Sequence, residues 1–290
     1  MGEPLRALPV SEPAPAKLNV FLRVRGRRSD GYHEIESLVQ PITLADGVRA
    51  AHRDHGFGLT LAGDRAAQVP PGDENLVLRA ARALAEDTGE SRGANLTLVK
   101  TIPVAAGLGG GSTDAAATLR ALDRLWGYGL PVERLAPVAA EVGSDVPALL
   151  SGGPTLVGGR GERLEGVTVA RTWWVLMLGD FEVSVGDAYR WWDEDGARSG
   201  PDPDPLLDAV TVADPARLGP LLFNDLEGPV VARHPEVGRA RESLLAAGAL
   251  GAVMCGSGPT VAGLARDGRH AEELAEAVGG IAVGSVIRTP

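Results

Sequence analysis

The sequence is poor in cysteine and contains no long apolar run. Its only cysteine is Cys255, which excludes an intrachain disulfide and a cysteine metal cluster and favours a reducing compartment. No apolar run approaches the roughly 18 to 20 residues that a membrane span requires. The N-terminal stretch MGEPLRALPVSEPAPA lacks the continuous apolar segment of a secretory signal and predicts a short loose tail. We therefore expect a cytoplasmic protein that does not span a membrane.

Lysine is also scarce. Of 28 basic side chains only Lys17 and Lys100 are lysine, and 38 acidic residues give a net charge of -10. This balance argues against binding to nucleic acid or to an anionic membrane, because both require a basic surface. An acidic protein still binds an anionic small molecule where its site is locally positive. Lys17, within APAKLNVFL, is therefore a residue of interest.

Length and patterning predict an α+β protein of two domains. The chain has 290 residues, of which 44% are hydrophobic, enough for two cores of ordinary size. Strands and helices are mixed without regular alternation, and we place the boundary near residue 160, giving domains 1–160 and 161–290. Expected strands are 17–24, 35–42, 95–102, 173–178, 252–255, 261–264 and 281–287, and expected helices are 73–86, 112–126, 132–142, 189–195, 235–247 and 270–278.

A glycine-rich segment, PVAAGLGGGSTDAA, lies between an expected strand and an expected helix. A helix N-terminus directs several backbone N–H groups and the positive end of its dipole at one point, which favours a phosphate. The segment has no lysine, so it is not the usual P-loop, and its glycines are too closely spaced for a dinucleotide-binding motif. The alternative is a flexible turn with Ser112 as the helix cap. Three adjacent glycines before Ser112 favour an anion site.

Two charged residues have both a structural and a catalytic interpretation. Asp145, in GSDVP, is placed to cap a short helix but is also suited to accept the proton of an attacking hydroxyl. Lys17 is either a solvated charge at the start of a strand or a cation that neutralises phosphates. Asn19 lies on the same face of that strand, where it is able to support Lys17.

Three further motifs contain aromatic, histidine or glycine residues. DGYH, residues 30–33, is typical of a hairpin tip, and its Tyr32 and His33 are suited to stack on a base and contact its polar edge. GSGPT, residues 256–260, is a second glycine turn between strands. His52 and His55 have no further ligand nearby in sequence, so we set a metal site aside.

Taken in order, the motifs APAKLNVFL, RSDGYHEIESL, PVAAGLGGGSTDAA, GSDVP, NDLE and GSGPT resemble the GHMP kinases, the superfamily of galactokinase, homoserine kinase and mevalonate kinase. The resemblance spans about residues 14 to 264. It implies a two-domain GHMP kinase fold, with an N-terminal α+β domain containing a left-handed βαβ unit and a ferredoxin-like C-terminal domain. DGYH and GSDVP indicate the branch that phosphorylates the 2-hydroxyl of a cytidine diphosphate sugar alcohol on the non-mevalonate route to isoprenoid precursors.

The resemblance also implies roles for residues. Lys17 and Asp145 would be the catalytic pair, with Asp145 as the base and Lys17 as its electrostatic partner. The substrate would contact Asn19, Tyr32, His33, Tyr189, Gly256, Ser257 and Gly258. The ATP phosphates, bridged by Mg²⁺, would bind the segment Pro103, Val104, Ala105, Ala106, Gly107, Leu108, Gly109, Gly110, Gly111, Ser112 and Thr113.

The sequence departs from the family pattern at Val185, which follows Ser184 where the family often carries Ser-Thr ahead of the second aromatic residue. A hydroxyl suited to the substrate phosphates is therefore missing. We expect ATP and a small-molecule substrate as partners, no nucleic acid or membrane, and a monomer or weak dimer. Two alternatives stay open: a GHMP kinase acting on mevalonate or homoserine, and a nucleotide-binding regulator without catalysis.

Overall fold

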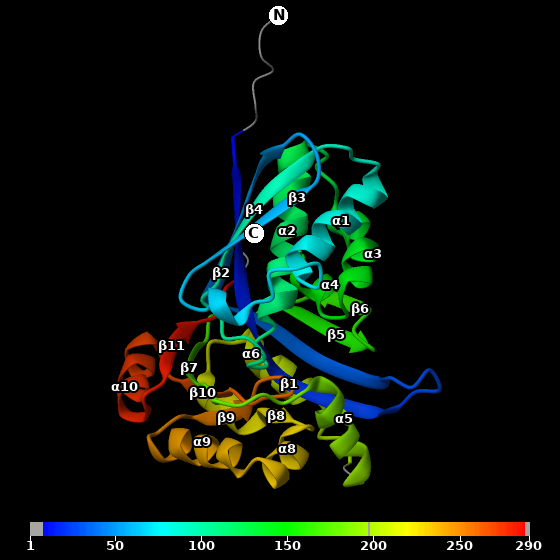
Figure 1. The fold of residues 1–290 in the computed structure, drawn as a ribbon. Coiled ribbons are helices and arrows are strands. Elements are labelled where there is room, and N and C mark those ends of the chain that lie inside the picture. The colour runs from blue at the N-terminus through cyan, green and yellow to red at the C-terminus, as the bar shows by residue number, and fades with distance from the viewer. Residues whose placement is uncertain (1–7, 197, 288–290) are drawn as a thin grey trace, which may run out of the picture. The chain divides into compact units, whose positions relative to one another are not determined.

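A computed structural model describes residues 8–196 and 198–287 (Figure 1). These residues form two compact units. The first comprises residues 8–16, 44–104 and 109–151, and the second comprises residues 17–43, 105–108, 152–196 and 198–287. Two long strands, β1 (Val10–Arg27) and β2 (His33–Arg53), contribute to both units. The division at residue 160 stays a prediction.

In the first unit, strands are covered by helices. The second half of β2 pairs antiparallel with β4 (Gly93–Val99), and β4 pairs parallel with β3 (Phe57–Ala62). The 3₁₀ turn η1 (Ala66–Gln68) and helix α1 (Leu76–Thr88) connect the two parallel strands, which makes a βαβ unit. Helices α2 (Gly110–Trp126) and α3 (Val132–Val142) pack with α1 and with each other, and α4 (Val146–Leu149) packs with α2 and α3.

Two local predictions for this unit are wrong. The helix expected over 73–86 begins later, at Leu76, and its cap is Asn75, whose side chain accepts from the Val77 N–H. The expected N-terminal tail is a strand from Val10 onward, because its side chains alternate between exposed and buried positions. Glu12 is buried there and pairs with Arg120 on α2, which also donates to the Pro13 carbonyl. Prolines are tolerated in a strand where no ladder N–H is required of them.

The second unit contains a four-stranded antiparallel sheet. Its order is β11 (Ile281–Gly284), β7 (Trp173–Met177), β10 (Val261–Ala265) and β9 (Gly251–Met254). In chain order this is 4-1-3-2, with helices between the first and second strands and between the third and fourth. That is the ferredoxin-like arrangement expected for the C-terminal domain. Helices α9 (Pro235–Ala246) and α10 (Gly268–Val278) pack on these strands.

The rest of the second unit contains residues 17–27 of β1, residues 33–43 of β2 and the elements that follow. β1 pairs with β8 (Phe223–Asn224), and β2 pairs with β5 (Thr155–Gly159), which pairs with β6 (Arg163–Gly166). The helices are α5 (Val185–Glu194), α6 (Asp204–Thr211), α7 (Pro215–Leu218), the 3₁₀ turn η2 (Gly219–Leu221) and α8 (Glu227–Arg233). Buried aliphatic side chains with Trp192 form the core of this unit.

No helix among residues 8–196 and 198–287 is long and apolar enough to cross a membrane.

Candidate active site

Lys17 lies on β1, and its ammonium has a neutral partner. The Lys17 Nζ donates to the Asn19 Oδ1 over 2.6 Å, which is the support expected from their shared strand face. The Asn19 Nδ2 donates to the Ser37 Oγ on β2 at 2.8 Å, and that hydroxyl donates to the Phe21 carbonyl at 2.6 Å. Lys17 and Asn19 are 6% and 5% exposed. This chain of hydrogen bonds holds the buried Lys17 ammonium in one position within the second unit.

Two glycine motifs that are far apart in sequence meet at Lys17. The Lys17 N–H donates to the Leu108 carbonyl at 3.0 Å, so residues 105–108 lie along the start of this strand segment. A side chain at Gly256 would place its Cβ 3.0 Å from the Lys17 Nζ and 3.1 Å from the Gly107 carbonyl oxygen. Residues 17–19, 105–108 and 256–258 therefore form one cluster within the second unit.

Gly107 cannot be replaced without moving this cluster. Its φ is 77°, in the region that favours glycine, and a Cβ there would overlap the Cys255 carbonyl and lie 2.8 Å from that of Gly258. Ala105 also has a positive φ, 56°, which is uncommon for a residue with a side chain. Strained backbone and close approach are both frequent at binding sites.

The motif NDLE braces the GSGPT turn, a role that was not assigned from sequence. The Asn224 Nδ2 donates to the carbonyls of Met254 and Gly256, at 2.8 and 2.7 Å. The Glu227 carboxylate accepts from the Met254 N–H at 2.7 Å and pairs with Arg241. Burial raises the pKa of Glu227, while its bond to Met254 and the charge of Arg241 oppose that rise. The only signal for this role in the sequence was the presence of polar residues within an apolar stretch.

In the first unit, α2 starts earlier than expected. It begins at Gly110, and Gly109 with φ 69° is its N-cap. The interpretation of Ser112 as the cap is therefore wrong, because Ser112 is already the third helical residue. The first N–H groups of a helix have no partner within it. Those of Gly110, Gly111 and Ser112 are thus the donors that this turn offers to an anion.

Asp145 is at the N-cap position of α4, but its side chain makes no capping hydrogen bond. Its φ and ψ of -86° and -16° are helical, whereas an N-cap residue that bonds with its side chain usually has extended angles. The structural interpretation of Asp145 as a cap is therefore not supported. Asp145 belongs to the first unit and Lys17 to the second.

DGYH forms the expected tip between β1 and β2. The Tyr32 N–H donates to the Asp30 side chain at 3.2 Å, and the Arg28 N–H donates to the Tyr32 carbonyl at 2.7 Å. Gly31 has φ 88°. Tyr32 itself is 56% exposed, with the Arg160 guanidinium 5.2 Å from its ring centre. The tip thus presents an aromatic ring that has a cation against it.

His33, rather than Tyr32, contacts the second aromatic residue. The His33 and Tyr189 rings stack with their centres 4.8 Å apart, and the His33 Nε2 lies 2.9 Å from the Asp193 Oδ1. Sequence reasoning missed Asp193, which comes one turn of α5 after Tyr189. In the second unit, His33 is thus held between the Tyr189 ring and the Asp193 carboxylate.

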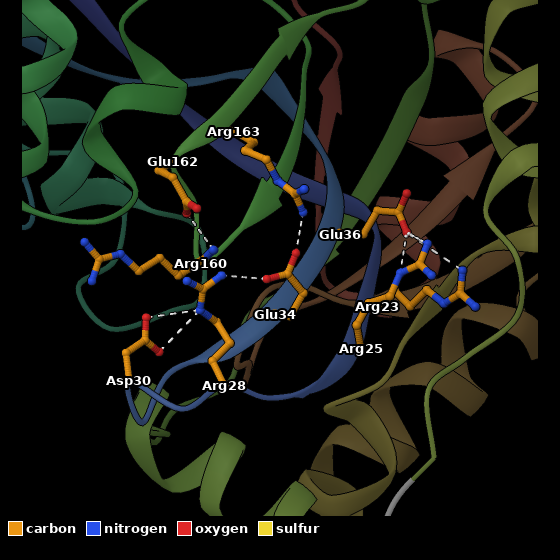
Figure 2. A network of polar contacts seen from close by, with 9 residues as sticks. All are labelled: Arg23, Arg25, Arg28, Asp30, Glu34, Glu36, Arg160, Glu162 and Arg163. Carbon is orange, nitrogen blue, oxygen red and sulfur yellow. Dashed lines mark hydrogen bonds and ion pairs between the residues drawn. The ribbon is translucent and has the colours of Figure 1, made fainter.

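A network of arginines and carboxylates surrounds the tip (Figure 2). Glu34 lies between Arg28 and Arg163, and the Arg28 Nη1 is 2.7 Å from Glu34. Glu36 pairs with Arg25 at 2.7 Å and lies 3.8 Å from Arg23. These ion pairs link β2 to β1, to Arg28 beside the tip and to Arg163 at the start of β6, so several weak surface pairs together fix the position of DGYH.

Ser184 and Val185, where the sequence departs from the family pattern, lie at the start of α5. The Ser184 hydroxyl is the N-cap of α5 and accepts from the Asp187 N–H at 3.0 Å. Val185 follows as the first residue of the helix and is 62% exposed. The Ser184 oxygen thus caps the helix as an acceptor, and Val185 supplies no second hydroxyl at this position.

No group of three or more histidine, cysteine, aspartate or glutamate side chains among residues 8–196 and 198–287 is arranged to hold a metal ion. A magnesium ion needs few protein ligands when phosphates and water fill its coordination positions.

Family models match both parts of the chain. Residues 75–153 match the GHMP kinases N-terminal domain and residues 206–282 match the GHMP kinases C-terminal domain. The 4-diphosphocytidyl-2-C-methyl-D-erythritol kinase of Symbiobacterium thermophilum is 46% identical over 266 residues, which cover 91% of this chain and 93% of that protein. The enzyme of the same name from Salinispora tropica is 41% identical over 97% of this chain and 91% of its own length.

Solved structures agree with these relatives. A crystal structure of 4-(cytidine 5'-diphospho)-2C-methyl-D-erythritol kinase matches with a TM-score of 0.82 and 35% identity, over 96% of this chain and 100% of that one. Homoserine kinase from Cytophaga hutchinsonii matches with a TM-score of 0.76 and 21% identity, over 99% of this chain and 97% of that one, a likeness of fold alone. The expected α+β GHMP kinase fold is thus confirmed. The chain belongs to the GHMP kinases and, among them, to the family of 4-diphosphocytidyl-2-C-methyl-D-erythritol kinases, ATP-dependent enzymes that phosphorylate an alcohol group.

Proposed function

We propose that this chain transfers the γ-phosphoryl group of ATP to the 2-hydroxyl of 4-diphosphocytidyl-2-C-methyl-D-erythritol, in the non-mevalonate route to isoprenoid precursors. The similarity of the named relatives over nine-tenths of the chain supports the substrate. The observation that carries the proposal is the cluster in which Lys17, Gly107 and Gly256 meet. A buried ammonium surrounded by glycine turns is suited to an anionic substrate that approaches the backbone closely.

In this proposal Asp145 is the base and Lys17 its electrostatic partner. Asp145 would accept the proton of the 2-hydroxyl as its oxygen attacks the γ-phosphorus in line. Lys17 would keep Asp145 charged and stabilise the negative charge that develops on the transferring group. The uncapped carboxylate of Asp145 and the neutral partner of the Lys17 ammonium support these roles.

The glycine segment would bind the phosphates of ATP. Backbone N–H groups at the start of α2 supply positive potential without basic side chains, which suits a protein of net charge -10. Mg²⁺ bound to the nucleotide would neutralise the phosphates during transfer; its protein ligands are not assigned. Catalysis would rest on positioning and electrostatics, with no covalent enzyme intermediate.

Tyr32, His33 and Tyr189 would bind the cytosine. His33 stacks on Tyr189 within the second unit, and Tyr32 presents its ring beside Arg160. For Tyr32 and Tyr189 to enclose a base, as the resemblance implies, His33 would have to leave its place on Tyr189 and contact the edge of the base. The location of the protein in the cytoplasm and its oligomeric state, a monomer or weak dimer, stay predictions.

The test is an acceptor panel with the purified protein, ATP and Mg²⁺. ADP release should depend on the cytidine diphosphate acceptor and be absent with mevalonate and homoserine. The variant Asp145→Asn should bind ATP as the wild type does and lose turnover by roughly a hundredfold or more. Full activity of that variant would exclude Asp145 as the base, and turnover of homoserine or mevalonate alone would exclude the proposed substrate.

A further inference from the structure

The second lysine of the chain, Lys100, has no part in the machinery described so far. It follows β4 in the first unit, is 2% exposed, and its Nζ donates to the Asp46 Oδ2 at 2.5 Å and to the Asp114 Oδ2 at 2.8 Å. Asp46 comes from β2 and Asp114 from α2. We call Asp46, Lys100 and Asp114 the buried triad. It joins three segments of the first unit at one point.

The ammonium of the triad lies directly beside the start of α2. A Cβ at Gly110 would lie 2.9 Å from the Lys100 Nζ and 3.1 Å from the Ile102 Cγ2, so the first helical residue has no room for a side chain. A cation at a helix N-terminus opposes the helix dipole. The two carboxylates offset that repulsion, which explains why one ammonium has two acidic partners.

Asp46 also fixes the backbone that leads into the glycine segment. Its Oδ1 accepts from the Thr101 N–H at 2.5 Å and from the Ile102 N–H at 2.8 Å, while its Oδ2 bonds Lys100. The residues just before Pro103 and the helix that starts at Gly110 are therefore tied to the same group. A small shift of that group would change the direction of the helical N–H donors.

We propose that Lys100 is a positioning residue for ATP: through the buried triad it holds the first turn of α2 so that the Gly110, Gly111 and Ser112 N–H groups face the phosphates. This inference rests on the proposed function, in which that turn binds ATP. Stability alone does not require charges here, because an apolar cluster of similar volume is often as stable as a buried ion pair. Two ionic bonds from one ammonium instead specify a single arrangement of the three segments.

One member of the triad, Asp114, has a raised pKa. The Asp114 Oδ1 is buried with no hydrogen-bond partner among the described residues. Burial raises the pKa of Asp114, Lys100 lowers it and Asp46 raises it, and together they bring this pKa to about 7. The neighbouring α1 presents the apolar Leu76 to Gly111. Protonation of Asp114 removes one negative charge beside the start of α2, so phosphates should bind more tightly when Asp114 is protonated.

The experiment measures binding of the non-hydrolysable analogue adenylyl imidodiphosphate with Mg²⁺, and the KM of each substrate, at about pH 6.5 and pH 8. The double variant Lys100→Met with Asp114→Asn leaves Asp46 on its two N–H donors. It removes one basic and one acidic side chain, so the formal net charge of the triad is unchanged and only the connection between the three segments is lost. The analogue and ATP should bind roughly tenfold or more weakly, since small misplacements of binding groups have large effects.

Two controls accompany it. The variant Asp114→Asn keeps Lys100 on Asp46. Because the phosphates of the analogue also titrate in this range, the two proteins are compared at each pH: relative to Asp114→Asn, the wild type should bind the analogue more weakly at pH 8 than at pH 6.5. The variant Asp123→Asn changes a second buried aspartate of α2, at the far end, which accepts from the Leu130 N–H. The KM of Asp123→Asn for ATP should stay within about twofold of the wild-type value. The KM of the double variant for the acceptor should also stay within about twofold of the wild-type value.

Unchanged analogue binding in the folded double variant would overturn the proposal, as would equal losses for ATP and acceptor, which indicate a purely structural role. If the double variant does not fold, the Asp114→Asn comparison decides: a pH dependence as large as in the wild type refutes the coupling. A wild-type protein that binds the analogue but phosphorylates no cytidine diphosphate acceptor would refute the proposed activity and leave this inference standing.

Discussion

The two lysines of this chain are both buried, yet their surroundings differ. The Lys17 ammonium, in the second unit, donates to the neutral amide of Asn19. The Lys100 ammonium, in the first unit, lies between the carboxylates of Asp46 and Asp114. A buried cation whose partner is neutral can still attract an anionic ligand. A buried cation with two acidic partners is already neutralised by them. The difference fits our proposals that the same side chain serves reaction chemistry in one unit and positioning in the other.

The largest expected effect is at Lys17. Lys17→Met should lower kcat by roughly a hundredfold or more, because the proposed transfer loses its electrostatic partner for Asp145. Steady-state kinetics with the cytidine diphosphate acceptor measure it. Lys17→Arg keeps the charge but requires room beside Gly256, so it should restore only part of the rate. Wild-type turnover in Lys17→Met would remove the assignment of a catalytic role to Lys17.

At Lys100 we expect the effect to appear first in stability. Lys100→Met alone leaves two buried carboxylates without their cation, which should lower the free energy of unfolding by about 3 to 5 kcal/mol. Urea unfolding measures this quantity. Lys17→Met should lower the free energy of unfolding by less, because the group left without its partner is the neutral Asn19 amide and not a carboxylate. Equal losses at the two lysines would break the comparison.

Asn19→Asp is expected to make Lys17 resemble Lys100. A carboxylate beside the Lys17 ammonium would compensate its charge, and turnover should fall by roughly tenfold or more while the protein stays folded. Ser37→Ala is the matched control, since it removes the hydrogen-bond partner of Asn19 without adding charge. If the two variants lose activity equally, the bond and not the charge is what matters.

The smallest expected effect is the pH dependence of stability from Asp114. Its pKa is raised from 3.8 to about 7, so the folded protein keeps a proton that the unfolded chain has released between these values. Stability from this group therefore falls as pH rises toward 7. Asp114→Asn should reduce the loss between pH 5 and pH 8 by on the order of 1 kcal/mol. Thermal unfolding at both pH values measures it; an unchanged slope would contradict the assignment.

Patterns along the chain predicted much of the fold. The helix 132–142 was predicted with its observed bounds, and the strands 252–255 and 261–264 were predicted to within one residue. The helix follows the helical period because it buries one face, and the two strands are short apolar runs that are buried at every position. It failed at residues 10–16, where two prolines suggested a tail, because the strand is held by burial and by bonds to α2 that no local signal reveals.

The site was only partly accessible from sequence. Motif order pointed to Lys17, Gly107 and Gly256, and the structure brings these three together in the second unit. It did not indicate that Asn224 braces the GSGPT turn or that Asp193 contacts His33. Those contacts join residues that are far apart in the chain, and a single sequence carries no record of such distances. The roles of Lys17 and Asp145 in catalysis stay predictions.

The sequence by itself determined which chemical groups this protein has: two lysines, closely spaced glycines and a capping-like aspartate in a recognisable order. Only the tertiary structure decided what each of them contacts. It left Asp145 without a capping bond, gave Lys17 a neutral amide and gave Lys100 two carboxylates. The reason is physical, because the behaviour of a charge depends on the solvent it loses and the partners it gains, and folding sets both.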